Sequence, residues 1–375
     1  MKSLLITLLA TTAVALSATP LRFHIGTYSS RGSEGIYRAT LDPQSGALSA
    51  PELAAKARNA NWLTWHPGGK ALYAVGQAAD AGDGKSGGEV VAYQVAADGS
   101  LQAFSRQATG MGTPCHLGVD PGCSMLIAAN YGEGAVLTFP LLEQGGIGPL
   151  AQTVKHEGRG PHARQQAPHA HGVTFDPLGK AHVFVPDLGI DRIVGYRLLT
   201  ATARIEAVES ATAQSPPGAG PRHLTFHPKG RFAYAVNELD ATVTQFEWNP
   251  ATSSLKPLRT VRSLPEEVTL PNTSAEILVH PTGRFLYVSN RGHDSIAVLT
   301  LDDTSGAPTL IQNVPSGGKV PRNFAIDPHG RFLVCANQDS DSIISLKIDP
   351  ASGRLEATGH SIAVPAPVRI LFDPR

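Results

Sequence analysis

The sequence has little cysteine. Its 375 residues include only Cys115, Cys123 and Cys335, and so small an odd set is not a disulfide framework. We expect all three to be small buried residues, with a pairing of Cys115 and Cys123 across a hairpin as the alternative in an oxidising compartment. The fold must therefore be stabilised mainly by packing and backbone hydrogen bonds.

The sequence also lacks net charge, since Lys plus Arg and Asp plus Glu each total 31. A nucleic-acid-binding surface is usually strongly basic, so this balance argues against a nucleic-acid partner. The 42% of hydrophobic residues is typical of a folded globular protein and not of a disordered chain. The 38 Gly and 29 Pro show no collagen-like period, which indicates many turns.

Long apolar runs are missing except at the N-terminus. There, the short basic segment Met1–Ser3 precedes the apolar run Leu4–Leu16 and a few small residues. This pattern predicts a secretory signal peptide over residues 1–18, the alternatives being a buried strand or a membrane anchor. The run is short for a membrane span. We therefore expect a periplasmic or secreted domain, residues 19–375, with no membrane contact after cleavage.

A repeat runs along this domain. Each copy has an apolar residue, then Asp or His, then Pro, usually with Gly two places later. The seven anchor prolines lie between 46 and 56 residues apart, a period that suits a four-stranded propeller blade. They are Pro67, Pro121, Pro177, Pro228, Pro281, Pro328 and Pro374.

Each copy predicts four strands and almost no helix. A short alternating run leads to the Pro-x-Gly turn, and a strongly apolar run, a β-branched run and a weaker run follow. The last copy leaves no room for further strands, whereas the N-terminus supplies three, at Phe23–Tyr28, Gly35–Leu41 and Ala47–Leu53. The sequence thus predicts an all-β, single-domain, seven-bladed β-propeller. Its ring is closed by a C-terminal first strand joining three N-terminal strands.

Polar residues recur at one place in the repeat, six and five positions before each anchor proline. Propeller blades place their first strand along the central channel, so these pairs predict a binding site at its mouth. The alternative is that they cap strands and bond to backbone. The pairs are Asn61-Trp62, Cys115-His116, His171-Gly172, Arg222-His223, Ala275-Glu276, Arg322-Asn323 and Val368-Arg369.

The ends of the second strands add further polar residues. If the first two strands of a blade are antiparallel, Arg222 and Glu238 lie at the same end of one blade, and Arg291 with His293 lies on the next. The long segments Lys155–Ala170 and Leu264–Ser274 are insertions, which in repeat folds usually map to the functional face.

Two catalytic strategies find little support in the sequence. His169 and His171 point the same way in an extended segment, but the chain lacks further ligands at metal-like spacing, so we expect no metal. No Gly-x-Ser-x-Gly elbow is present, which argues against a serine nucleophile.

Long motifs resemble those of the bacterial propeller 6-phosphogluconolactonase family, which also includes the fungal carboxy-cis,cis-muconate cyclases. The likeness extends from HIGTYS at His24 to VPAPVRILF at Val364, although Ala167-Pro168 replaces Gly-Pro and Val75-Gly76-Gln77 stands where an Asn-Glu pair is usual. The other motifs are APHAHGVTFDP, DLGIDRIVGYRL, GAGPRHLTFHPKGRFAYAVNELDATV, SNRGHDSIAV and GGKVPRNFAIDPHGRFLVCANQDSDSI.

The resemblance implies a seven-bladed propeller and an active site of one His, two Arg and one Glu. It places them at His171 (or His169), Arg222, Glu238 and Arg291. The predicted signal peptide is unexpected for an enzyme that acts on a cytosolic sugar-phosphate lactone. Whether the substrate of this protein is phosphorylated is therefore open.

We therefore expect a cofactor-free lactonase that hydrolyses a sugar-type lactone, similar to 6-phosphogluconolactone, by metal-independent general acid–base catalysis. Glu238 or His171 would activate water, Arg222 and Arg291 would stabilise the oxyanion, and the partner is a small lactone or organic acid. The alternatives are a carboxymuconate-type lactonising cycloisomerase and a non-catalytic exported propeller that binds a ligand or protein. The expected substrate-binding residues are His116, His169, His223, His293, Arg322 and Asn337.

Overall fold

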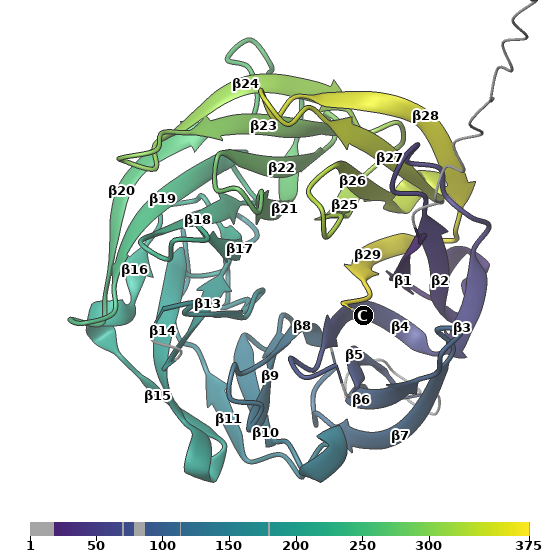
Figure 1. The fold of residues 1–375 in the computed structure, drawn as a ribbon. Coiled ribbons are helices and arrows are strands. Elements are labelled where there is room, and N and C mark those ends of the chain that lie inside the picture. The colour runs from purple at the N-terminus through teal and green to yellow at the C-terminus, as the bar shows by residue number, and fades with distance from the viewer. Residues whose placement is uncertain (1–18, 70, 79–86, 113, 179–180, 375) are drawn as a thin grey trace, which may run out of the picture.

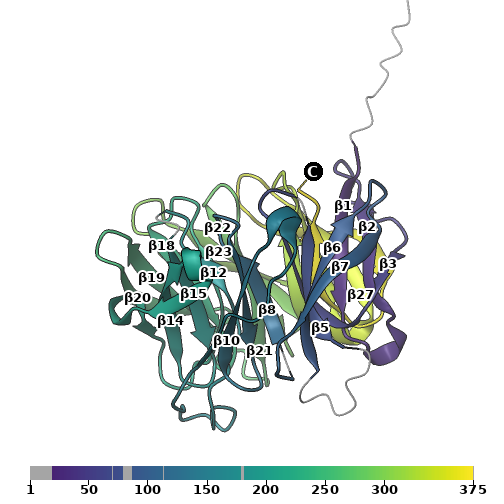
Figure 2. The ribbon, with the colours of Figure 1, turned by 90° about the horizontal axis from the view of Figure 1, so that it is seen from below.

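The computed structural model describes residues 19–374 except 70, 79–86, 113 and 179–180. Seven β-sheets are arranged in a ring (Figure 1), and their strands run between the two faces of the ring (Figure 2). The predicted all-β, seven-bladed propeller is therefore confirmed. The predicted signal peptide, residues 1–18, lies outside the described residues. None of the helices in the described part is long and apolar enough to cross a membrane.

Six blades are built from consecutive strands, and we number them from the blade that holds both chain ends. Blade 1 contains β29 (Pro367–Phe372), β1 (Leu21–Thr27), β2 (Gly35–Leu41) and β3 (Glu52–Lys56). Blade 2 contains β4 (Arg58–Trp65), β5 (Leu72–Gln77), β6 (Gly88–Val95) and β7 (Leu101–Ala108). Blade 3 contains β8 (Pro114–Val119), β9 (Met125–Asn130), β10 (Ala135–Pro140) and β11 (Gln152–Lys155).

The remaining blades follow the same plan, and blade 4 has a fifth strand. Blade 4 contains β12 (Thr174–Phe175), β13 (His182–Asp187), β14 (Arg192–Leu199), β15 (Arg204–Ala207) and β16 (Ala213–Gln214). Blade 5 contains β17 (Pro221–Phe226), β18 (Phe232–Asn237), β19 (Thr242–Asn249) and β20 (Ser254–Arg262). Blade 6 contains β21 (Thr273–Val279), β22 (Phe285–Arg291), β23 (Ser295–Leu301) and β24 (Pro308–Pro315). Blade 7 contains β25 (Pro321–Ile326), β26 (Phe332–Asn337), β27 (Ser342–Ile348) and β28 (Leu355–Ala363).

Helix is confined, in the described residues, to five single turns of 3-10 type. They are η1 (Ser30–Gly32), η2 (Glu143–Gly145), η3 (Thr200–Thr202), η4 (Glu209–Ala211) and η5 (Gln338–Ser340).

The ring closes as predicted, because β29 pairs with β1 in antiparallel register, with Ile370 opposite Ile25. One boundary in this blade was predicted wrongly. The fourth strand is Glu52–Lys56, not Ala47–Leu53, because Asp42 N–H bonds to the carbonyl of Ala47 and a turn occupies the residues between.

The Asp of the repeat closes the turn that follows the innermost strand. Oδ1 of Asp327 accepts hydrogen bonds from the backbone N–H groups of Arg331 (2.5 Å) and Phe332 (2.6 Å). Oδ1 of Asp120 accepts from Met125 N–H at 2.6 Å in the same way. The repeated residue therefore satisfies backbone donors that would otherwise be buried without a partner.

Six of the seven innermost strands carry a β-bulge around the position six residues before the anchor proline, whereas β12 of blade 4 begins only at Thr174. In β17, Pro221 lies opposite Asn237 and His223 opposite Val236, so Arg222 is the extra residue. Arg322 holds the equivalent position in β25. A bulge re-aims side chains that would otherwise alternate between the two faces of a strand. Two consecutive residues of each bulged strand can thus face the channel.

Neighbouring blades are joined by apolar packing and by a recurring tyrosine. Tyr234 of blade 5 donates its hydroxyl hydrogen bond to the carbonyl of Gly306 in blade 6 (2.7 Å), and Tyr287 of blade 6 does the same to Gly353 in blade 7 (2.9 Å). Burial raises the pKa of both tyrosines, which keeps these hydroxyls as donors. Each glycine sits in a turn with positive φ.

The cysteines are all free thiols. Cys335 is buried, as expected, but Cys115 and Cys123 are partly exposed, and the alternative of a pairing between these two is wrong.

Replacing Gly306 by Ala should destabilise the ring at one blade junction. Its φ is +64°, and an added Cβ would lie 2.5 Å from Cδ2 of Phe232. We expect a loss of about 3 kcal/mol in the free energy of unfolding from backbone strain plus overpacking. Gly32 is the matched control, because its φ is +83° but nothing lies within 4 Å of an added Cβ. Gly32→Ala should cost only about 1 kcal/mol in urea unfolding; equal losses would contradict the junction argument.

Candidate functional site

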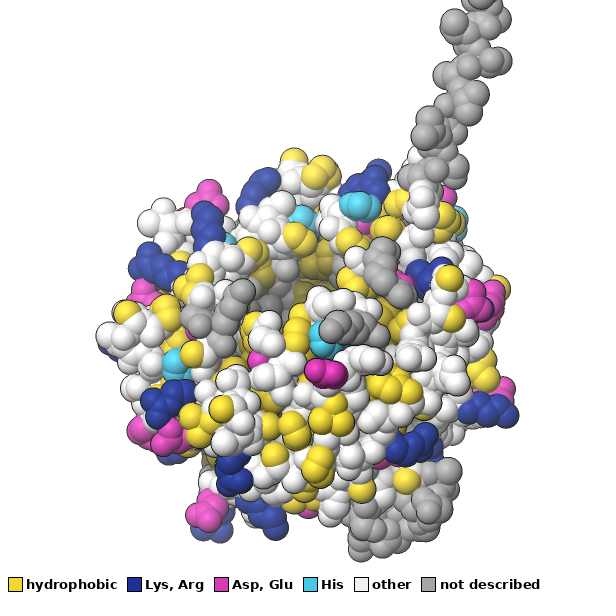
Figure 3. All heavy atoms as spheres, turned by 60° about the horizontal axis from the view of Figure 1, so that its bottom comes forward, with side chains coloured by type: hydrophobic (Ala, Val, Ile, Leu, Met, Phe, Trp, Pro, Cys, Tyr) yellow, Lys and Arg dark blue, Asp and Glu magenta, His cyan; other side chains and the backbone are white. Residues whose placement is uncertain are grey.

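A cavity of about 350 Å³ opens at the end of the channel where the bulges lie, and every blade contributes to its wall. The space-filling view shows the other face of the ring, the one toward which Figure 1 looks; it too is hollowed near its centre, with charges of both signs around the periphery (Figure 3). The wall consists of Tyr28, Asn59, Asn61, Gly76, Gln77, Gly112, Pro114, Cys115, Tyr131, Arg164, His171, Glu238, Arg291 and Arg322.

Glu238 forms ion pairs with three arginines, and its side chain is only 3% exposed. Nη1 of Arg164 lies 2.6 Å from Oε1, and Nη2 of Arg291 lies 3.0 Å from Oε2. Nε of Arg222 is 3.1 Å from Oε2, an ion pair without the alignment of a hydrogen bond. The predicted meeting of Arg222 and Glu238 at one end of a blade is confirmed.

These contacts fix the charge of the carboxylate. Burial is the largest influence on the pKa of Glu238 and would raise it, but the charges of Arg291 and Arg222 outweigh burial and hold that pKa well below its usual range. Glu238 is therefore ionised at neutral pH and is a weak proton acceptor. Burial, followed by the charges of Arg322 and Arg291, lowers the pKa of Arg222 to about 10.

Two of these arginines are held by the backbone at the start of blade 6. Nη1 of Arg222 donates to the carbonyl of Ala275 at 2.6 Å, and Nη2 of Arg291 donates to the carbonyl of Ser274 at 2.9 Å. Arg291 lies on the cavity wall. Arg222 is 3% exposed and lies behind Glu238, off the wall. It therefore acts on the cavity through Glu238.

His171 lies beside Cys115 on the same wall. Its backbone N–H bonds to the carbonyl of Pro186 (2.9 Å), and its Nδ1 is 3.8 Å from Sγ of Cys115. Burial, reinforced by the charge of Arg222, holds the pKa of His171 well below its usual range, while Glu238 acts in the other direction. The imidazole is therefore neutral, and Nε2 bonds to no residue that the structure describes.

The insertion Lys155–Ala170 carries Arg164 into the cavity. Its Gln165 is fully buried and donates to the carbonyl of Leu188 (2.8 Å) and to Asp191 (2.7 Å). Nη2 of Arg164 also contacts the hydroxyl of Tyr131 at 3.2 Å. These contacts fix the loop beside the site. The sequence predicted that this insertion would lie on the functional face, but it did not identify Arg164 as the residue that reaches the cavity.

Arg322 is the cation of the wall without a carboxylate partner among the described residues. Its guanidinium lies 5.3 Å from the ring centre of Tyr28. The wall therefore presents Arg164, Arg291 and Arg322 against a single carboxylate, Glu238. A positive cavity of this kind suits an anionic ligand.

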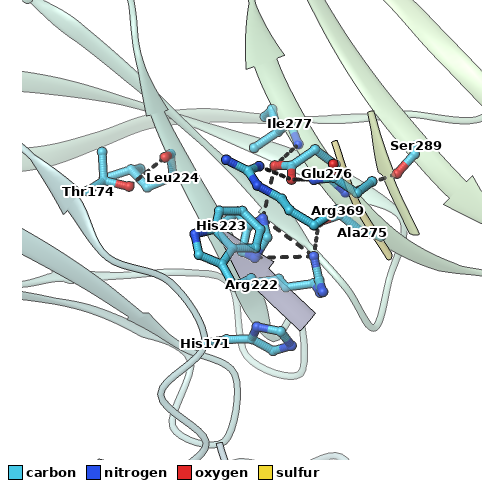
Figure 4. A network of polar contacts seen from close by, with 12 residues as sticks. His171, Thr174, Arg222, His223, Leu224, Ala275, Glu276, Ile277, Ser289 and Arg369 are labelled. Carbon is cyan, nitrogen blue, oxygen red and sulfur yellow. Dashed lines mark hydrogen bonds and ion pairs between the residues drawn. The ribbon is translucent and has the colours of Figure 1, made fainter. Parts of the chain in front are cut away.

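A second layer of side chains lies beneath the wall, one residue further along the innermost strands. His223 Nδ1 is 2.9 Å from Oε1 of Glu276, and Asn323 Nδ2 bonds to Oε2. Figure 4 shows part of this network, with His223, Glu276 and Arg369 above Arg222 and His171 in the view. Its six members contact one another around the channel: Trp62, His116, His223, Glu276, Asn323 and Arg369.

The structure brings four predicted residues to the wall: His171, Glu238, Arg291 and Arg322. His116 and His223 belong to the layer beneath, because they lie one residue beyond the bulged residue of their strands. Three others bond elsewhere and do not line the cavity. His169 stacks on Tyr131 (4.4 Å between ring centres), His293 bonds to Ser295, and Asn337 bonds to the carbonyl of Ser316.

Several wall residues were not predicted. Asn59 and Gln77 bond to each other at 2.6 Å in blade 2, and Tyr28 follows the end of β1; Tyr131, by contrast, was expected at the mouth because it follows a second strand. Gln77 ends the second strand of its blade, as Asn237 does in blade 5, so the strand-end rule could have found it. Arg164 lies in an insertion that has no counterpart in the repeat, and no periodic signal marks it. Within the described ranges, no three His, Cys, Asp or Glu side chains gather as metal ligands would.

Comparison with known proteins gives one consistent result. Residues 22–372 match the family described as "Lactonase, 7-bladed beta-propeller". The chain is 37% identical over 350 residues to 6-phosphogluconolactonase of Bacillus subtilis, which covers 93% of this chain and 97% of that one.

Solved structures agree with this match. A periplasmic gluconolactonase from Pseudomonas aeruginosa is 32% identical with a TM-score of 0.89, covering 94% of this chain and 99% of that one. A putative 6-phosphogluconolactonase from Bacteroides fragilis is 28% identical with a TM-score of 0.86, covering 96% of this chain and 99% of that one.

Proposed function

The chain belongs to the seven-bladed β-propeller lactonase family and is a sugar lactonase, and on this premise we propose that it hydrolyses an anionic lactone, similar to 6-phosphogluconolactone, in the cavity around Glu238. The observation that carries the proposal is the wall itself, where three arginines face one carboxylate. A lactone that bears a phosphate or carboxylate would supply the missing negative charge.

His171 is the general base of the proposed reaction. A neutral imidazole on the wall takes a proton at Nε2 from a water molecule as the water oxygen attacks the lactone carbonyl. The tetrahedral intermediate then breaks its bond to the ring oxygen, and the imidazolium returns the proton to that oxygen. The carboxylic acid formed ionises to solvent, so one proton is released for each lactone opened.

Glu238 supports this step without accepting the proton. Its charge raises the pKa of His171 against the effects of burial and Arg222, and so it stabilises the imidazolium that forms. It also holds Arg164 and Arg291 in place. Of the two bases considered from the sequence, His171 fits the local charges better.

Two wall arginines, Arg291 and Arg322, bind different negative charges of the substrate. Nε and Nη2 of Arg291 are taken by backbone carbonyls and Glu238, which leaves Nη1 without a partner among the described residues. We assign it to the developing oxyanion. Arg322 binds the distal anion of the substrate.

The acid side of the pH profile tests the role of His171. Because its pKa is lowered, the fraction of neutral imidazole persists below the usual midpoint of about 6.5. We expect kcat/KM for 6-phosphogluconolactone, measured by proton release above the spontaneous rate, to fall with a midpoint below about 6.5.

His171→Gln is the variant for this test. It should lower kcat about 10²- to 10⁴-fold and remove the acid midpoint. Prolonged treatment with a chelator should leave the wild-type rate unchanged. A normal rate in His171→Gln would refute this base, and turnover of a muconic lactone alone would favour the cycloisomerase.

Arg322→Gln tests the distal anion site. Loss of a charged hydrogen bond should raise KM for 6-phosphogluconolactone about 10- to 100-fold, with KM for gluconolactone changed less than about threefold. Since the Arg322 charge lowers the pKa of His171, its removal should also move the acid midpoint upward. An equal rise in KM for both lactones would contradict the assignment.

We also propose that the protein is exported, as the pattern in residues 1–18 indicates. The similarity to a periplasmic gluconolactonase supports this location. Expression of the full chain in a bacterium should give a periplasmic protein whose first residue, by N-terminal sequencing, follows the region Ala15–Ala18. An intact Met1 on a cytosolic protein would contradict export.

A further inference from the structure

Glu276 is a buried carboxylate that the mechanism above does not use. It is 3% exposed and comes from β21, five residues before its anchor proline. Oε1 accepts from the backbone N–H of Ile277 at 3.0 Å and contacts Nδ1 of His223 at 2.9 Å. Oε2 accepts from Asn323 and lies 3.9 Å from Nη1 of Arg369. Both oxygens are therefore held from several sides.

His223 connects this carboxylate to Arg222. Nη1 of Arg222 lies 3.3 Å from Nε2 and 3.4 Å from Nδ1 of His223, so the guanidinium lies against the imidazole ring. The same Nη1 donates to the carbonyl of Ala275, the residue before Glu276. Figure 4 shows His223 between Arg222, below it in the view, and Glu276, above it. The position of Arg222 thus depends on β21 twice.

The charges lead to the same conclusion. Arg222 is 3% exposed and lies near two other cations, Arg291 and Arg322, whose charges oppose its own. Glu238 and Glu276 are the two carboxylates that favour its charged form. Without Glu276, Arg222 would keep one counter-ion, Glu238, which Arg164 and Arg291 already share.

We propose that Glu276 is a positioning residue of the site, which through His223 and the strand that carries Ala275 fixes Arg222 and thereby the Glu238 carboxylate against His171. This inference rests on the proposed function, because it assigns Glu238 its role beside the general base. Glu276 touches no part of the cavity wall, so its effect is on the geometry of the reacting groups and not on substrate contact.

Glu276→Gln tests the proposal, with Glu247→Gln as the matched control. Glu247 is a partly exposed carboxylate of β19 in blade 5, paired with Arg231 and not part of the cavity wall. Displacement of Glu238 should lower the kcat of Glu276→Gln about 10- to 100-fold, with KM changed less than about threefold. Glu247→Gln should keep both constants. A wild-type kcat in Glu276→Gln would overturn the proposal.

A double variant separates positioning from simple charge balance. Glu276 also faces Arg369, whose guanidinium packs 3.7 Å from the ring centre of Trp62. Glu276→Gln with Arg369→Met removes one charge of each sign. If Glu276 merely balances Arg369, the double variant regains stability and kcat together, which would refute positioning. We expect its thermal stability to recover while kcat stays low.

A spectroscopic readout keeps the two proposals distinguishable. The ¹⁵Nε signal of Arg222, assigned from its loss in Arg222→Lys, should shift in Glu276→Gln and stay in place in Glu247→Gln. An unmoved signal in Glu276→Gln would overturn the positioning role even if kcat falls. If the wild-type protein turns over no sugar lactone, the proposed function fails, whereas the signal still tests whether Glu276 fixes Arg222.

Discussion

The site depends on one backbone irregularity, the bulge near the start of six of the seven innermost strands. In a regular strand, consecutive side chains point to opposite faces, so a blade would offer the channel only one of each pair. With the bulge, Arg322 reaches the cavity wall and Asn323 reaches the layer below. The same extra residue gives Arg222 its place behind Glu238. The geometry that gathers charges at the channel is therefore a property of the repeat.

The repeat also explains how much of this was predictable. Hydrophobic alternation and the Asp- or His-Pro turns follow from local chemistry, so the strand plan, the blade number and the closure by β29 could be predicted. The meeting of Arg222 with Glu238 followed from antiparallel pairing alone. The exception was the fourth strand of blade 1, where the turn after Asp42 shifts the strand by several residues.

Depth in the channel could not be predicted, because it depends on the bulge and not on residue type. His116 and His223 have the same chemistry as His171, yet they lie one residue further along and one layer lower. Arg164 was missed for a different reason, since an insertion has no period and its path is set by the buried contacts of Gln165. Residue type indicated a polar channel mouth, whereas backbone geometry decides which side chains line the cavity.

The pairing of β29 with β1 has a consequence for biosynthesis. The first strand of blade 1 comes from the last residues of the chain, so that blade stays incomplete until Phe372 has left the ribosome. Every blade contributes to the cavity wall, and the arginines around Glu238 come from blades 5 and 6 and from the insertion between blades 3 and 4. The strands of an unfinished chain can pair, but the wall is completed only when the ring closes. The cavity wall is thus complete only in a ring in which β29 is paired with β1.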